Sequence, residues 1–86
     1  MIRLKDIYER YGMEYRLLER TEKVALYAVF LSGYRVNYEV IKIRVHKPDK
    51  YNRVPYEIYP NTEKFGIDGW SYNHLEDAKK KYNEMV

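Results

Sequence analysis

The chain has 86 residues, and its 16 basic and 13 acidic side chains give a formal net charge of +3. This length supports one modest hydrophobic core, so we expect a single domain over residues 1–86. The absence of cysteine excludes a disulfide framework and a thiolate metal site, which favours a reducing, cytoplasmic location. No apolar run approaches the roughly 18 residues of a membrane span, and residues 1–6 lack the apolar stretch of a signal peptide, so we expect no membrane contact.

The first twelve residues, MIRLKDIYERYG, predict a short N-terminal helix. Oppositely charged side chains stand four residues apart, and Gly12 stands where a C-terminal cap is expected. The apolar residues recur at helical spacing and would form one stripe: Met1, Leu4, Ile7, Tyr8 and Tyr11.

Residues 24–31, VALYAVFL, predict a central strand because they are apolar on both faces. One helix cannot cover both faces. We expect the face of Tyr27, Val29 and Leu31 to be covered by the N-terminal helix, by a protein partner or by a second copy of the chain in a homodimer.

Residues 34–46 predict the longest strand, with an alternation that slips midway. The slip predicts a β-bulge near Val40 and Ile41 and turns Lys42, Arg44 and His46 outward together. Residues 47–53 predict a loop, and VPYEIY, residues 54–59, predicts an edge strand because it contains Pro55.

The stretch PNTEKFGIDGW, residues 60–70, is too rich in turn-forming residues for regular structure. After it, Asn73 and Glu76 have the spacing of a capping box and predict the start of a C-terminal helix. The core-facing stripe of this helix would contain Leu75, Ala78, Tyr82 and Met85. The whole pattern predicts an α+β fold, with a three- to four-stranded antiparallel meander, a short N-terminal helix and a C-terminal helix packed on the sheet.

No combination of residues in the sequence indicates catalysis. The two histidines, His46 and His74, have no cysteine or carboxylate cluster beside them, so we expect no metal site and no cofactor. The serines stand at a turn and before a helix without a nucleophile motif, and there is no phosphate-binding glycine loop. We therefore predict that the protein is not an enzyme.

The basic residues gather in the middle of the chain. Residues 34–55 contain six basic and two acidic side chains, and most of the basic ones fall in a strand and loop interleaved with tyrosines. We predict that this surface, and above all residues 42–56, binds a partner: an acidic protein surface, or alternatively nucleic acid through phosphate contacts and base stacking. A solvated hairpin end is the simpler interpretation. The candidate binding residues are Lys42, Arg44, His46, Lys47, Lys50, Tyr51, Arg53, Tyr56 and Tyr59.

The C-terminal stretch GWSYNHLEDAKKKYNEM, residues 69–85, resembles small uncharacterised proteins encoded by bacteriophages and mobile elements, in which short strands precede a Trp-containing turn and a final helix. The resemblance covers about a fifth of the chain and transfers no site residue. It implies an inhibitor that binds a host or defence protein without catalysis. We therefore expect a small non-catalytic protein-binding module, with a nucleic-acid-binding protein as the alternative.

Overall fold

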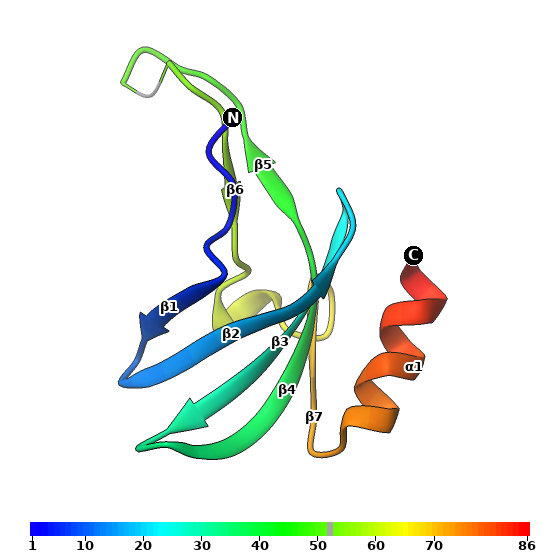
Figure 1. The fold of residues 1–86 in the computed structure, drawn as a ribbon. Helices are drawn as coiled ribbons and strands as arrows, with labels where there is room; N and C mark the ends of the chain where they lie inside the picture. The colour runs from blue at the N-terminus through cyan, green and yellow to red at the C-terminus, as the bar shows by residue number, and fades with distance from the viewer. Residues whose placement is uncertain (52) are drawn as a thin grey trace.

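The computed structural model describes residues 1–51 and 53–86 and shows an α+β fold. Its five-stranded antiparallel sheet has the order β1-β2-β3-β4-β7 and carries the C-terminal helix α1 on one face (Figure 1). The strands of this sheet are β1 (Ile7–Arg10), β2 (Met13–Arg20), β3 (Val24–Leu31), β4 (Tyr34–Lys42) and β7 (Gly69–Tyr72). The first four strands form a meander, but β1 and β2 have no counterpart among the predicted strands, and the predicted strand over residues 54–59 lies outside this sheet. With β7, the sheet is larger than the predicted three or four strands.

The predicted N-terminal helix is wrong, because residues 7–10 form β1 and pair with β2. The turn between them is the reason. Tyr11 has φ 55° and Gly12 has φ 74°, and a two-residue turn with two positive φ values matches the twist of a β-hairpin. Gly12 therefore closes a hairpin instead of capping a helix. In β1 the half-buried Tyr8 and Arg10 alternate with the exposed Ile7 and Glu9, which is the period of a strand.

Strand β3 lies at the centre of the sheet and is buried on both faces, as its sequence predicts. Its first face packs against α1 (Leu75–Met85), whose predicted stripe is confirmed. The buried side chains of this half of the core are Val24, Leu26, Ala28, Tyr38, Val40, Ala78 and Tyr82.

The second face of the sheet is covered from within the chain. Leu4 and Tyr8 of the N-terminal segment pack on it. The N-terminal segment therefore covers this face as predicted, but not as a helix. Tyr59 and Phe65, from the segment before β7, complete the cover. Tyr27 and Val29 are fully buried here, whereas Leu31 is 49% exposed and lies outside this core.

The predicted β-bulge near Val40 and Ile41 is wrong. The two residues pair in continuous register with Leu26 and Ala25, and the register of β3 and β4 shifts instead at Val29 and Phe30. Both faces of β4 are covered, so Val40 and Ile41 are both fully buried without a change of face.

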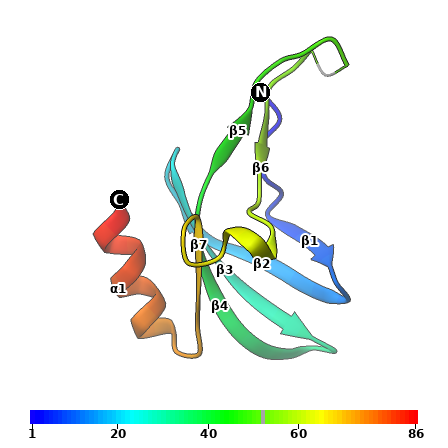
Figure 2. The same ribbon diagram turned by 180° about the vertical axis from the view of Figure 1, so that it is seen from behind.

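Beyond β4 the chain leaves the sheet as a projecting hairpin, which we call the arm. It contains β5 (Arg44–His46), β6 (Tyr56–Ile58) and the connecting residues 47–51 and 53–55; Asn52, part of the predicted loop 47–53, lies outside the described residues. The N-terminal segment runs along the arm in both views (Figure 2). β6 is an edge strand of the two-stranded β5–β6 sheet, as Pro55 predicts. Its outer side is partly covered by the N-terminal segment, because Ile2 donates its N–H to Pro55 and accepts from the Glu57 N–H, at 2.9 and 2.8 Å.

The segment between β6 and β7 contains only one short 3₁₀ turn, η1 (Thr62–Lys64), and the predicted irregular stretch ends at Gly69 where β7 begins. The predicted capping box does not form. The N-cap of α1 is His74, one residue after Asn73, and it makes no side-chain capping hydrogen bond. Within the described residues, no helix has the length and apolar character needed to cross a membrane.

Candidate functional site

The structure divides the nine candidate binding residues, the predicted row, among four places. At the base of the arm, Lys42 and Arg44 engage neighbouring elements. The Lys42 ammonium lies 5.7 Å from the centre of the Trp70 ring on β7. Arg44 donates to the Asp68 carboxylate at 2.7 Å, and this hydrogen bond lowers the pKa of Asp68. Both cations therefore already have a favourable contact, Lys42 with β7 and Arg44 with the residue that precedes β7.

The far end of the arm carries the exposed part of the row. The side chains of Lys47, Lys50 and Arg53 are exposed, and Tyr51 is 81% exposed with the Lys50 ammonium 5.2 Å from its ring centre. The apolar Val54 is 50% exposed beside them. This tip therefore exposes cations and apolar groups side by side.

Across the arm, His46 and Tyr56 stack on one another. Their ring centroids lie 4.7 Å apart with an interplanar angle of 10°, and the residues are direct partners in the β5–β6 register. The His46 Nε2 lies 3.7 Å from the Asp49 carboxylate, while its Nδ1 is buried without a hydrogen-bond partner in the part of the chain that the structure describes. The stack is a cross-strand contact between the two strands of the arm, just below its tip.

The base of the arm is fixed to the sheet by an ion pair. Arg20 on β2 and Glu57 on β6 form two hydrogen bonds of 2.7 Å each, and Glu57 also accepts from the Leu4 N–H at 2.8 Å. The Glu57 side chain is 1% exposed and that of Arg20 is 16% exposed. The hydrogen bond from Arg20 lowers the pKa of Glu57, so the carboxylate form is favoured at this joint.

Tyr59, the last residue of the predicted row, does not lie on the arm surface. It follows β6 and turns inward, where it makes edge contacts with Tyr8, Tyr15 and Tyr27 at centroid distances of 5.4 to 5.5 Å. Tyr8 and Tyr15 stack in parallel at 4.9 Å. These four rings, the tyrosine cluster, fill the second face of the sheet, which explains part of the high tyrosine content.

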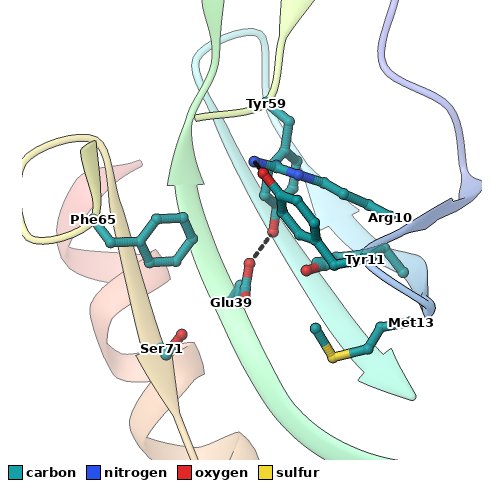
Figure 3. Close-up of a pocket in the computed structure, with 8 residues that line it drawn as sticks. Arg10, Tyr11, Met13, Glu39, Tyr59, Phe65 and Ser71 are labelled. Atoms are coloured by element: carbon teal, nitrogen blue, oxygen red, sulfur yellow. Dashed lines mark hydrogen bonds between the residues drawn. The ribbon is translucent and has the colours of Figure 1, made fainter. Parts of the chain in front are cut away.

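A pocket of about 220 Å³ opens beside the tyrosine cluster (Figure 3). Four aromatic rings line it: those of Tyr11, Tyr15, Tyr59 and Phe65. The other lining side chains are Arg10, Met13, Glu39 and Ser71. The pocket is thus lined by residues from strands β1, β2, β4 and β7 and from the segment before β7.

Glu39 is the buried charge of this pocket. It is 8% exposed, and its Oε1 accepts the hydroxyl proton of Tyr59. Asn37 Nδ2 lies 3.4 Å from the other carboxylate oxygen and also donates to Ser71 at 3.2 Å. No ion pair to Glu39 is formed by any Lys, Arg or His of the described residues.

The hydroxyls of Tyr59, Tyr15 and Tyr27 hold their protons tightly. Burial raises the pKa of Tyr59, and the neighbouring Glu39 charge raises it further. Burial likewise raises the pKa of Tyr15, and it raises the pKa of Tyr27 to about 12. Tyr59 therefore remains a hydrogen-bond donor to Glu39 at neutral pH.

Sequence reasoning missed this pocket, although one signal was available. Glu39 shares its strand parity with Ile41 and Ile43, so a carboxylate interrupts the apolar face of a strand that is buried on both sides. The rings of Tyr11 and Phe65 line the pocket but belong to turns far apart in the chain. No local spacing in the sequence indicates that the two rings line one pocket.

No group of three or more His, Cys, Asp or Glu side chains that would suit a metal ion occurs within residues 1–51 and 53–86. Comparison of the chain with protein-family models, with curated proteins and with solved structures gives no match.

Proposed function

We propose that the protein is a non-catalytic protein-binding module that docks through its arm onto an acidic protein surface with an apolar centre. One observation carries the proposal: exposed apolar side chains and exposed cations share the arm and the N-terminal segment beside it. Met1 and Ile2 are 60% and 61% exposed, and Val54 is 50% exposed. Apolar groups surrounded by charge are the composition of a protein interface core with a polar rim.

The structure of the arm supports this proposal because its base is fixed. The buried Arg20–Glu57 pair and the backbone bonds of Ile2 join the arm to the sheet and to the N-terminal segment. A surface that is already ordered loses less conformational entropy on binding than a flexible loop. The tip residue Tyr51 is a suitable contact residue, since exposed tyrosines are frequent at binding hot spots.

Charge complementarity determines the kind of partner. The exposed cations Lys47, Lys50 and Arg53 would face carboxylates at the rim of the interface and accelerate association. The resemblance of residues 69–85 to phage and mobile-element proteins adds that the partner is a host or defence protein, which the module would block by occupying its surface. Such inhibition requires no chemistry from this chain.

The experiment compares capture by three forms of the protein. Wild type and the variants Val54→Asp and Lys80→Asp are immobilised and exposed to extract of the native host, and captured proteins are identified by mass spectrometry. Val54 lies on the arm, and Lys80 is exposed on α1, so the second variant is the matched control. A protein retained by wild type and Lys80→Asp but lost with Val54→Asp supports the proposal; equal retention by all three, or none, contradicts it.

Nucleic acid is the second candidate, favoured by the exposed ring of Tyr51 among three cations at the tip. Lys42 and Arg44 contribute less than their charge suggests, because they already contact Trp70 and Asp68. With about three phosphate contacts, duplex affinity should fall about 40-fold between about 50 and 200 mM salt. Fluorescence anisotropy with duplex and single-stranded oligonucleotides measures this. Tight binding that persists at high salt and is lost in Tyr51→Ala would replace the protein-binding proposal.

A further inference from the structure

The pocket beside the tyrosine cluster contains a buried carboxylate that has no role in the proposed docking function of the arm. Glu39 is buried in its wall, and Figure 3 shows the Glu39 carboxylate and the Tyr59 hydroxyl meeting within the ring-lined hollow. Removal of a carboxylate from water is costly unless a cation or several hydrogen bonds compensate it. Glu39 receives hydrogen bonds from Tyr59 and Asn37 and forms no ion pair with the described residues.

The walls of the pocket favour a cation over a neutral guest. Tyr11, Tyr15, Tyr59 and Phe65 present rings to the hollow, and aromatic faces attract ammonium groups within about 6 Å. Arg10 already demonstrates this attraction, because its guanidinium lies 4.8 Å from the Tyr11 ring centre and 5.2 Å from that of Tyr59. Arg10 itself forms no ion pair with Glu39; its guanidinium donates to the Pro60 carbonyl at 3.0 Å.

We propose that this pocket is a binding site for an organic ammonium group, whose charge pairs with Glu39 and whose carbon atoms contact the surrounding rings and Met13. The volume of about 220 Å³ accommodates a short alkylammonium stem and excludes a large cofactor. Free amines and the lysine side chain of a peptide carry the same chemistry. This site is separate from the arm, so the proposal does not depend on the proposed docking function.

The test uses n-butylammonium as the probe and follows the protein by ¹H–¹⁵N NMR. Neutral n-butanol and anionic butyrate have similar stems and separate the charge from the hydrophobic contribution. We expect saturable shifts confined to the residues around Glu39 and Ser71, with butylammonium binding at least about tenfold more tightly than butanol. Equal binding of the three probes, or no binding of butylammonium, overturns the proposal.

Two variants and one control variant locate the interaction. Glu39→Gln keeps the size of the side chain and removes its charge, so butylammonium affinity should fall at least about tenfold, whereas Glu84→Gln, at an exposed position on α1, should leave it unchanged. Arg10→Gln removes the like charge at the rim and should leave affinity equal or increase it. A loss of affinity in Arg10→Gln would indicate an anion site and contradict the proposal.

The proposal can be tested even if Glu39→Gln does not fold, because the comparison of butylammonium with butanol needs only the wild type. A capped Gly-Lys-Gly peptide then separates the two sources of the ammonium group. Binding of the peptide at least as tight as that of butylammonium supports a lysine side chain as the ligand. Binding of the amine alone supports a free small amine, and binding of neither contradicts the site.

Discussion

The guanidinium of Arg20 makes two parallel hydrogen bonds to the carboxylate of Glu57, each 2.7 Å long, and so joins the arm to the five-stranded sheet. The two residues are 37 positions apart in the chain, and both are largely buried. The geometry is the bidentate form in which arginine binds carboxylates most strongly. The orientation of the arm, and hence the surface proposed for docking, depends on this pair.

Removing the charge of Glu57 should destabilise the protein. In Glu57→Gln the buried Arg20 loses its counter-charge, and we expect the free energy of unfolding to fall by about 3 kcal/mol. The matched control is Glu22→Gln, because Glu22 pairs with Arg3 at a site where the two side chains are 70% and 52% exposed. That exposed pair should contribute less than about 1 kcal/mol. Urea denaturation of both variants measures the difference, and equal stability would contradict the structural role of the Arg20–Glu57 pair.

The same pair should make stability depend on acid pH. The hydrogen bond from Arg20 lowers the folded-state pKa of Glu57 below its ordinary value of 4.5. A carboxyl group with a lowered pKa contributes stability above the unfolded-state pKa and loses that contribution as the pH falls through the folded-state pKa. We therefore expect wild type to lose more stability than Glu57→Gln when urea denaturation is repeated at about pH 7 and about pH 3. Parallel losses in the two proteins would contradict this assignment.

The elements that the sequence predicts correctly are those with a single consistent pattern. The α1 stripe of Leu75, Ala78, Tyr82 and Met85 fits only a helix, and VALYAVFL fits a strand with two covered faces. Residues 1–11 fit two periods at once, since Tyr8 and Arg10 alternate with Ile7 and Glu9 as well as fitting a helix. The choice between the periods depends on β2 as a pairing partner, which local reasoning does not include.

The candidate site was predictable only where neighbours in sequence stay neighbours in space. The tip residues Lys47, Lys50 and Arg53 share one short loop and remain together on the arm. Tyr59 was predicted with Tyr56, yet it lies in the tyrosine cluster, because the chain leaves β6 after Ile58 and turns toward the sheet. The pairing of Arg20 with Glu57 likewise depends on the arm folding back along the N-terminal segment, for which no sequence motif exists.

The hydroxyl of Tyr59 should contribute to stability through Glu39. Tyr59→Phe removes the donor that Glu39 accepts, and leaving a buried carboxylate without it should cost about 2 kcal/mol. Tyr34→Phe is the control, since Tyr34 is 80% exposed and should change stability by less than about 0.5 kcal/mol. Repeating Tyr59→Phe in a Glu39→Gln background tests the partner: the cost should shrink, because the hydrogen bond then has a neutral acceptor. An unchanged cost would mean that the hydroxyl acts elsewhere.

Helix α1 should be held to the sheet by its buried side chains. Tyr82 is 6% exposed and packs in the core half formed by β3 and β4, so Tyr82→Ala should reduce the free energy of unfolding by about 3 to 4 kcal/mol. Lys80 is exposed on the same helix, and Lys80→Ala should change it by less than about 0.5 kcal/mol. Chemical denaturation monitored by circular dichroism compares the two. If both variants unfold at the wild-type midpoint, α1 is not docked as described.

One substitution in the turn between β3 and β4 should increase the stability of the protein. Ser32 has φ 51° and Gly33 has φ 83°, so both residues occupy the left-handed region of a two-residue hairpin turn. Asparagine tolerates this conformation better than serine, and Asn-Gly is the preferred sequence for such turns. We expect Ser32→Asn to raise stability by about 0.5 to 1 kcal/mol and Ser32→Val to lower it by at least about 1 kcal/mol, because a β-branched side chain clashes with its own backbone there. Thermal unfolding of the two variants beside wild type checks the order Asn above Ser above Val, and any other order would contradict the positive φ at this position.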